Sequence, residues 1–182
     1  DWEIDDADII FLGGGTDREM EIVCERLSSK VLKLKEYIER GGSFIATCGG
    51  FEMLGKHFHT TKGKTNGLGI LDIDADCLPN QKRLIGNIVL ECEGISSCVV
   101  GFENHGGIMN IGSYNHFGKV IKGFGNNNEG EFEGLCYKNL IATYLHGPLL
   151  PKNPELCDKI LKNALQNKYP EFDTLIDLDD EL

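Results

Sequence analysis

The chain has 182 residues, of which 41% are hydrophobic and 26% are charged, and these values are typical of one globular domain with an apolar core. Its net charge of −11 at pH 7 argues against a nucleic-acid partner, and no apolar stretch approaches the roughly 20 residues of a membrane-spanning helix. Seven cysteines without regular spacing do not suggest a disulfide framework, so we expect a reducing, cytoplasmic setting.

The first part of the chain alternates predicted strands and helices. Residues 8–12 (DIIFL) predict a buried strand of a parallel sheet, and residues 17–40 predict a helix. The apolar face of that helix would hold Ile22, Leu27, Val31, Leu34 and Ile38. Residues 43–47 predict a second strand and residues 50–56 a second helix. Because glycines stand at the turns, the pattern favours an α/β sheet with right-handed crossovers.

The remainder of the chain predicts antiparallel or mixed β-structure followed by a helix. The strand-like runs cover residues 83–91, 98–103, 118–123 and 140–145, with glycine- and asparagine-rich turns between them. Asn153 and Pro154 then predict the N-cap and first position of a final helix. Its predicted apolar face consists of Leu156, Ile160, Leu161 and Leu165. The acidic end, about residues 172–182, is predicted to be a solvated tail of a single domain over residues 1–182.

Cys48 stands between the second predicted strand and the second predicted helix, in the stretch TCGGFEMLG. A sharp strand-to-helix turn with small neighbours is typical of a nucleophile, and a helix N-terminus favours a thiolate. The alternative interpretation is a small residue packed under the helix. No other cysteine of the chain has this context, so the others are interpreted as core or surface residues.

His146 is the predicted base for such a nucleophile, although it could also be an ordinary turn histidine. It ends the apolar run LIATYL and therefore projects from a strand end, where active sites of open α/β sheets collect. His57 and His59 do not complete a four-ligand zinc set with Cys48, so we predict no metal site.

The loop GGGTDRE, residues 13–19, also follows a predicted strand. It fails as a dinucleotide fingerprint because Arg18 stands where the third glycine is required, and it lacks the lysine of a phosphate-binding loop. Its main-chain N–H groups could instead face a developing oxyanion. The alternative is a tight turn onto the helix.

Six stretches together resemble the class I glutamine amidotransferases of the cobyric-acid-synthase-like branch, and within it the glutaminase subunits of lipid II isoglutaminyl synthases. They are FLGGGTDRE (11–19), TCGGFEMLGK (47–56), GLGILD (67–72), RLIGNIVLE (83–91), VGFENHGG (100–107) and YLHGPLLPKNP (144–154). The resemblance implies a class I glutamine amidotransferase-like, flavodoxin-like fold, with a mixed sheet flanked by helices. Members of the family begin with a further strand and helix, which this sequence lacks, so we expect an N-terminally truncated domain.

The resemblance also implies roles for individual residues. Cys48 would be the nucleophile and His146 the general base and acid. The N–H of Gly49, with one from Gly14 or Gly15, would form the oxyanion hole. Arg83 would contact the substrate, and its guanidinium suits the α-carboxylate of glutamine.

Two positions depart from the family pattern. Glu52 stands where many relatives have glutamine, which puts substrate contact there in doubt. Pro148 stands where many have the glutamate that orients the histidine. Glu103, or an acid from a partner subunit, would then support His146, or the pair would work as a dyad.

The implied activity is a glutaminase that supplies ammonia to a Mur-ligase-like synthetase subunit in a heterodimer. That partner would use ATP to amidate D-glutamate of the lipid II stem peptide, and this chain would need no cofactor. The alternatives are the glutaminase domain of a cobyric acid or cobyrinate amidotransferase, a cysteine hydrolase that is not a glutaminase, and a non-catalytic binding module.

Overall fold

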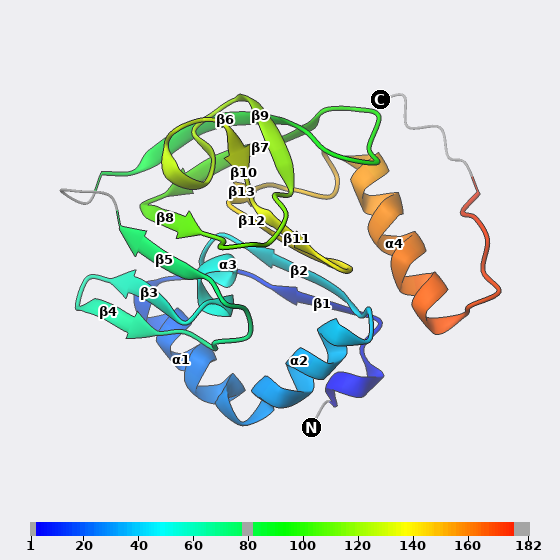
Figure 1. Ribbon diagram of the computed structural model, residues 1–182, viewed down its shortest axis with the longest axis horizontal. Coiled ribbons are helices and arrows are strands. Elements are labelled where there is room, and N and C mark those ends of the chain that lie inside the picture. The colour runs from blue at the N-terminus through cyan, green and yellow to red at the C-terminus, as the bar shows by residue number, and fades with distance from the viewer. Residues whose placement is uncertain (1–2, 78–81, 177–182) are drawn as a thin grey trace.

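The computed structural model describes residues 3–77 and 82–176 and forms a mixed α/β fold (Figure 1). Its central sheet has the strand order β1-β2-β12-β11, formed by β1 (Ile9–Leu12), β2 (Ser43–Thr47), β12 (Leu140–Thr143) and β11 (Leu135–Tyr137). The first three strands are parallel and β11 is antiparallel. The expected mixed sheet with flanking helices is therefore confirmed.

Strand β1 pairs with β2 at one edge of the described part of this sheet. Ile10 and Leu12 face the core, whereas Phe11 points away from it and is 60% exposed. The expectation of a buried strand is therefore wrong at Phe11, although Ile9 on the same face packs partly against the core that includes residues of the final helix.

The predicted helix over residues 17–40 is wrong as a single element. It is divided into α1 (Asp17–Leu27), the 3₁₀ turn η2 (Ser28–Lys30) and α2 (Val31–Glu39). The hydroxyl of Ser28 donates to the Glu25 carbonyl, a local bond of the kind by which serine competes with regular helix. The break also changes the buried face, because Met20 is buried while Ile22 is exposed.

A second sheet of antiparallel strands has the order β10-β9-β6-β7-β13. Its members are β10 (Phe132–Glu133), β9 (Gly118–Lys122), β6 (Leu84–Glu91), β7 (Val99–His105) and β13 (Leu145–His146). The predicted strand over residues 140–145 is therefore divided between two sheets, since β12 lies in the first and β13 in the second. The Thr143 hydroxyl accepts the Leu145 N–H at the change of direction.

Several short elements have no strong signal in the sequence. Strand β3 (His57–Thr60) pairs with β4 (Gly63–Asn66), and β5 (Asp74–Cys77) pairs with β8 (Gly107–Asn110). Two further 3₁₀ helices are η1 (Ile4–Asp6) and η4 (Gly125–Asn127). Strands such as HFHT and DADC are polar, so they lack the apolar runs by which strands are recognised.

The final helix is α4 (Pro154–Lys168), as predicted. Asn153 occupies the N-cap position, but its side chain makes no capping bond and instead bonds both main-chain groups of Val100 in β7. The predicted apolar face is partly wrong, because Leu161 is exposed and Ala164 is buried in its place. Of the predicted acidic tail, residues 177–182 lie outside the described residues.

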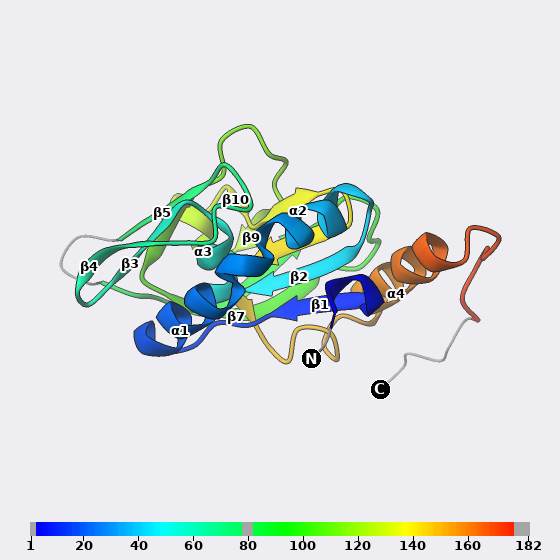
Figure 2. The same cartoon turned by 90° about the horizontal axis from the view of Figure 1, so that it is seen from below.

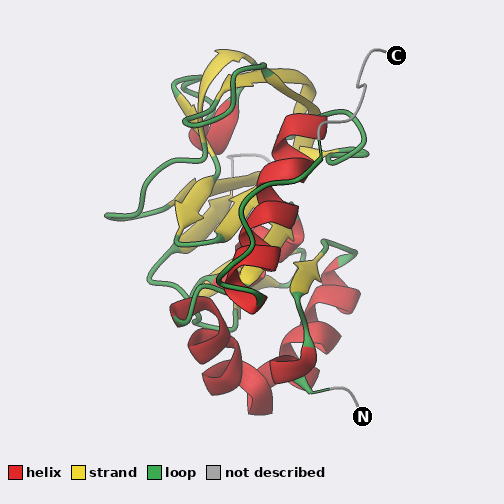
Figure 3. Ribbon diagram, turned by 90° about the vertical axis from the view of Figure 1, so that its right-hand side faces the viewer, coloured by secondary structure: helices red, strands yellow, loops and turns green. Residues whose placement is uncertain are grey.

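Two apolar cores lie on opposite faces of the central sheet. One joins the sheet to α1, α2 and α3 (Gly49–Leu54), and the other joins it to the second sheet and α4. Figure 2 shows α1 and α2 on one side of β1 and β2, and Figure 3 shows α4 beside the sheets. In the part of the chain that the structure describes, no helix has the length and apolarity needed to cross a membrane.

We predict that Gly50→Ala strongly destabilises the fold. A Cβ at Gly50 would overlap the carbonyl oxygen of Leu12, a main-chain atom of β1 that cannot move aside without distorting the strand. Overpacking of this kind typically costs about 1–3 kcal/mol, which thermal unfolding would report as a Tm lower by about 2–4 °C per kcal/mol. Gly86→Ala is the matched control, because its Cβ would lie 3.6 Å from the nearest atom. Equal melting temperatures for the two variants would contradict the prediction.

Candidate active site

Cys48 occupies a strained turn between β2 and α3. Its φ of 51° and ψ of −116° lie in a region that residues with a Cβ rarely adopt, in agreement with the sharp turn expected of a nucleophile. The main-chain N–H of Cys48 donates to the Thr143 carbonyl at 2.8 Å, which ties the turn to β12. The thiol is therefore presented at the carboxyl ends of the parallel strands.

The glycine loop after β1 runs directly beside this turn. A Cβ on Gly14 would lie 2.7 Å from the Gly49 nitrogen and 3.4 Å from the Cys48 Cβ, so glycine is needed for the close approach. The Gly49 N–H makes a hydrogen bond with the Cys48 sulfur. The structure thus brings Gly14 and Gly49 together, and Gly15 lines the adjacent pocket. Their roles as oxyanion donors stay a prediction.

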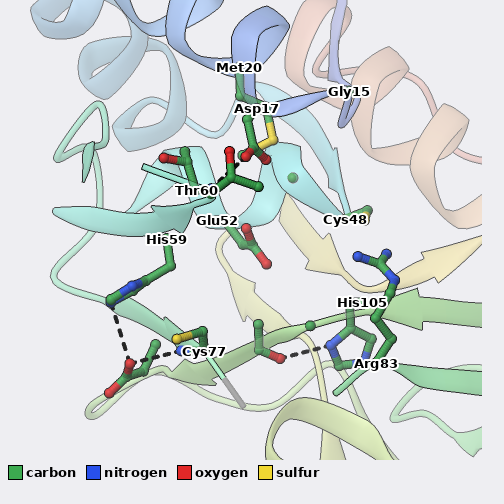
Figure 4. A pocket seen from close by; sticks show the side chains of 15 residues that line it. Gly15, Asp17, Met20, Cys48, Glu52, His59, Thr60, Cys77, Arg83 and His105 are labelled. Atoms are coloured by element: carbon green, nitrogen blue, oxygen red, sulfur yellow. Dashed lines mark hydrogen bonds and ion pairs between the residues drawn. The ribbon is translucent and has the colours of Figure 1, made fainter. Parts of the chain in front are cut away.

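A cavity of about 340 Å³ opens beside Cys48 and is large enough for a small metabolite (Figure 4). Gly15, Gly49, Glu52 and Arg83 are among its lining residues, together with His105 and Gly106. Polar and charged groups therefore converge on the thiol from the two sheets and from the loop after β1.

Arg83, which precedes β6, is held at the rim of this cavity. Its Nε donates to the Asn104 side-chain oxygen at 2.9 Å and its Nη2 donates to the Asn104 carbonyl at 2.7 Å. Figure 4 shows the guanidinium group on the Cys48 side of the cavity. Neither bond uses Nη1, so that N–H group can meet a carboxylate in the cavity.

His146 leaves the same edge of the central sheet as Cys48. Thr143 of β12 pairs with Thr47 of β2. Cys48 directly follows Thr47, and His146 lies three residues after Thr143. The His146 ring makes a hydrogen bond with the Asn104 main chain, and its Nε2 is buried without a partner among the described residues. The Asn104 main chain therefore contacts the ring, while, among the described residues, the buried Nε2 has no partner and His146 does not line the cavity.

Glu103 does not support His146, contrary to one expectation from the sequence. In the pairing of β7 with β13, Glu103 stands opposite Leu145, so its side chain lies on the other face from His146. Its buried carboxylate accepts the N–H groups of Phe124 and Gly125 and lies 3.7 Å from Nε2 of His105. An ordering acid for His146 must come from elsewhere, or a main-chain group takes its place.

Glu52 forms a buried cluster with Tyr144 and His105 beneath the cavity. The Tyr144 hydroxyl donates to the Glu52 carboxylate at 3.1 Å, and the Tyr144 ring stacks on His105 with ring centres 3.7 Å apart. Burial raises the pKa of Glu52 to about 7. In the sequence, Glu52 stands out as a departure from the family pattern, whereas Tyr144 has no distinguishing signal because it lies inside an apolar strand run.

The electrostatics favour a neutral thiol and a neutral imidazole. Burial, with a further contribution from the charge of Glu52, raises the pKa of Cys48 to about 11. Burial, followed by the charges of His105 and Arg83, lowers the pKa of His146. Attack by the sulfur therefore requires transfer of the thiol proton to a base as the bond forms.

His59, Asp76 and Cys77 are the residues best suited to hold a metal ion in the part of the chain that the structure describes. Their ligand atoms lie within 4.8 Å of one another at the edge of the cavity. Asp76 and Cys77 are exposed, and exposed groups of this kind commonly gather without an ion. The chemistry inferred from Cys48 and His146 uses none of these donors.

The model of the CobB/CobQ-like glutamine amidotransferase domain matches residues 1–154. The subunit GatD of lipid II isoglutaminyl synthase (glutamine-hydrolyzing) from Staphylococcus aureus is 45% identical over 93% of this chain and 68% of its own length. The subunit of the same name from Streptococcus pneumoniae is 36% identical over 93% of this chain and 65% of its own length. The chain thus spans about two thirds of these relatives.

A probable cobyric acid synthase from Methanothermobacter thermautotrophicus is 28% identical over 79% of this chain and 31% of its own length. Among solved structures, a glutamine amidotransferase matches with a TM-score of 0.64 and 16% identity, over 86% of this chain and 79% of its own. PurLQS from Thermotoga maritima matches with a TM-score of 0.62 and 16% identity, over 88% and 82% of the two chains. At these identities the structural likeness concerns the fold.

We predict that alkylation of Cys48 accelerates steadily between pH 7 and pH 10. The raised pKa of about 11 means that the reactive thiolate increases about tenfold per pH unit over this range. Iodoacetamide labelling of the free protein, with mass mapping of the modified peptide, measures the rate at Cys48 alone. A rate that is already constant near pH 7 would instead indicate a thiolate–imidazolium pair and contradict the prediction.

Proposed function

Because the chain belongs to the CobB/CobQ-like glutamine amidotransferase family, we propose that it hydrolyses glutamine to glutamate and ammonia, with Cys48 as the nucleophile. The observation that carries the proposal is the strained turn that presents the Cys48 thiol to a cavity also lined by Arg83. A buried structural cysteine has no need of this conformation, whereas a nucleophile that must meet its substrate does.

In the first half of the reaction, the Cys48 sulfur attacks the δ-carbonyl carbon of glutamine while the thiol proton passes to Nε2 of His146. The N–H of Gly49, with one from the Gly14–Gly15 turn, stabilises the oxyanion. When the tetrahedral intermediate collapses, the carbon–nitrogen bond breaks and His146 returns the proton to the leaving ammonia. A γ-glutamyl thioester remains on Cys48.

In the second half, water attacks the thioester carbonyl and gives a proton to His146. The carbon–sulfur bond then breaks, the sulfur recovers a proton from His146, and glutamate is released. Throughout both halves, Arg83 binds the α-carboxylate of the substrate. The Asn104 main chain contacts the His146 ring, which supports a Cys–His dyad in this chain.

The proposal also includes the acceptor of the ammonia. The two GatD relatives are subunits of lipid II isoglutaminyl synthases, and their identity over most of this chain supports the same assignment here. We infer a cytoplasmic heterodimer with a Mur-ligase-like synthetase, which would use ATP to activate D-glutamate of the lipid II stem peptide for amidation. The alternative acceptor is a cobyric acid intermediate, which the 28% identity to a probable cobyric acid synthase supports more weakly.

We predict that the wild-type protein, alone or with the synthetase subunit, releases ammonia from glutamine and that Cys48→Ala abolishes the release. His146→Ala should lower kcat by about 10²–10⁴-fold, the usual contribution of general acid–base catalysis. A coupled assay with glutamate dehydrogenase measures the ammonia, and circular dichroism verifies that both variants fold. Release from Cys48→Ala at the wild-type rate would refute the nucleophile, and an unchanged His146→Ala would refute the base.

We predict that Arg83→Ala raises the KM for glutamine by at least about tenfold and changes kcat much less. The α-carboxylate is remote from the reacting bond, so its contact is equally strong in the substrate and transition-state complexes. Steady-state kinetics measure both constants. Arg83→Lys is the matched control, because it keeps the charge but loses the planar fork and should fall between the two. An unchanged KM in Arg83→Ala would assign Arg83 a structural role.

A further inference from the structure

The three residues that precede His146 form a hydrogen-bonded corner between the two sheets. The Thr143 carbonyl accepts the N–H of Cys48 at 2.8 Å, while its hydroxyl accepts the N–H of Leu145 at 3.0 Å. One residue thus contacts the main chain of the nucleophile and the main chain next to the base. A shift of Thr143 would therefore change the positions of both.

A buried carboxyl group, whose pKa burial raises to about 8, holds this corner in place. Glu133 in β10 is completely buried, and its two oxygens accept the Thr143 hydroxyl at 2.8 Å and the Tyr144 N–H at 2.6 Å. Burying a carboxyl group is costly unless its hydrogen bonds are satisfied. Here these bonds lead to Thr143 and Tyr144, which lie between the main-chain contact to Cys48 and His146. Glu133 lies in the second sheet, whereas Thr143 lies in the central sheet.

We propose that Glu133 is a positioning residue for the Cys48–His146 pair and acts through Thr143 and Tyr144. The inference rests on the proposed glutaminase function. Glu133 touches neither substrate nor reacting atoms. It holds the corner from which the main chains of Cys48 and His146 are placed relative to each other. An acid bound to the histidine ring performs the comparable task in many cysteine and serine enzymes.

A purely structural role for Glu133 is the competing explanation. Loss of a buried, doubly bonded carboxylate would then lower stability, while the protein that remains folded would turn over at the normal rate. Positioning predicts a different outcome, because a misplacement of about 1 Å between reacting groups can cost about 10²-fold in rate without weakening substrate binding. The split between kcat and KM, measured below the melting temperature, separates the two.

The first test replaces the hydroxyl of the corner. Thr143→Val keeps the shape of the side chain but loses both hydroxyl bonds, and we expect kcat to fall about 10–100-fold with KM within about twofold of wild type. Thr143→Ser restores the hydroxyl and should recover most of kcat. Thr174→Val, an exposed threonine away from the cavity, is the control for the substitution itself. A Thr143→Val enzyme with wild-type kcat, or a Thr143→Ser enzyme as slow as it, would overturn the proposal.

The second test addresses the carboxylate directly. Glu133→Gln keeps an oxygen for the Tyr144 N–H but puts a donor where the Thr143 hydroxyl now finds an acceptor, so it should retain more of kcat than Glu133→Ala. Glu133→Ala removes both partners and should lose as much as Thr143→Val. If Glu133→Ala fails to fold, the Thr143 pair still decides the question. A folded Glu133→Ala with normal kcat would refute the proposal.

A readout that does not need turnover keeps this proposal separate from the proposed function. The ring-proton signal of His146 is assigned by its absence in His146→Gln. Proton NMR then measures the titration midpoint of this signal against pH in each variant. We expect its midpoint to move in Thr143→Val and to return in Thr143→Ser. If the wild-type protein releases no ammonia, the glutaminase function fails while this titration still tests the positioning. An unmoved midpoint would overturn it.

Discussion

The site depends on the parallel pairing of β2 with β12. Thr47 lies opposite Thr143, and the ladder continues one step further, because the Cys48 N–H donates to the Thr143 carbonyl. This last bond belongs to the sheet and to the nucleophile turn at once. The strained conformation of Cys48 is therefore held by the most regular part of the fold, as expected of strain at a functional site.

Around that turn, burial disfavours the charged forms of the two proposed catalytic side chains. Burial raises the pKa of Cys48 and lowers that of His146, so both groups are neutral at rest. Arg83 is the fixed cation of the cavity rim, held by Asn104. The same Asn104 main chain bonds the His146 ring. One short stretch of β7 therefore organises both the predicted substrate contact and the predicted base.

Sequence patterns predicted the parts of this site that depend on local rules. Glycines directly after Cys48 indicate a sharp strand-to-helix turn, and a histidine at a strand end indicates a side chain at the edge where active sites collect. The nucleophile turn could therefore be predicted. The break at Ser28 and the transfer of the chain between sheets at Tyr144 depend on tertiary contacts, which local periodicity does not report. Glu133 was invisible for the same reason, because a glutamate in a two-residue strand resembles any surface residue until its burial is known.

The change of sheet between β12 and β13 fixes the length of the chain at this place. The first strand is in register with β2 and the second with β7. An inserted or deleted residue between Thr143 and His146 would have to break one of these registers, since a slip of one residue reverses which face each side chain occupies. Length variation is absorbed more readily by exposed turns that join neither of these registers. At the corner, a substitution preserves both registers, whereas an insertion or a deletion does not.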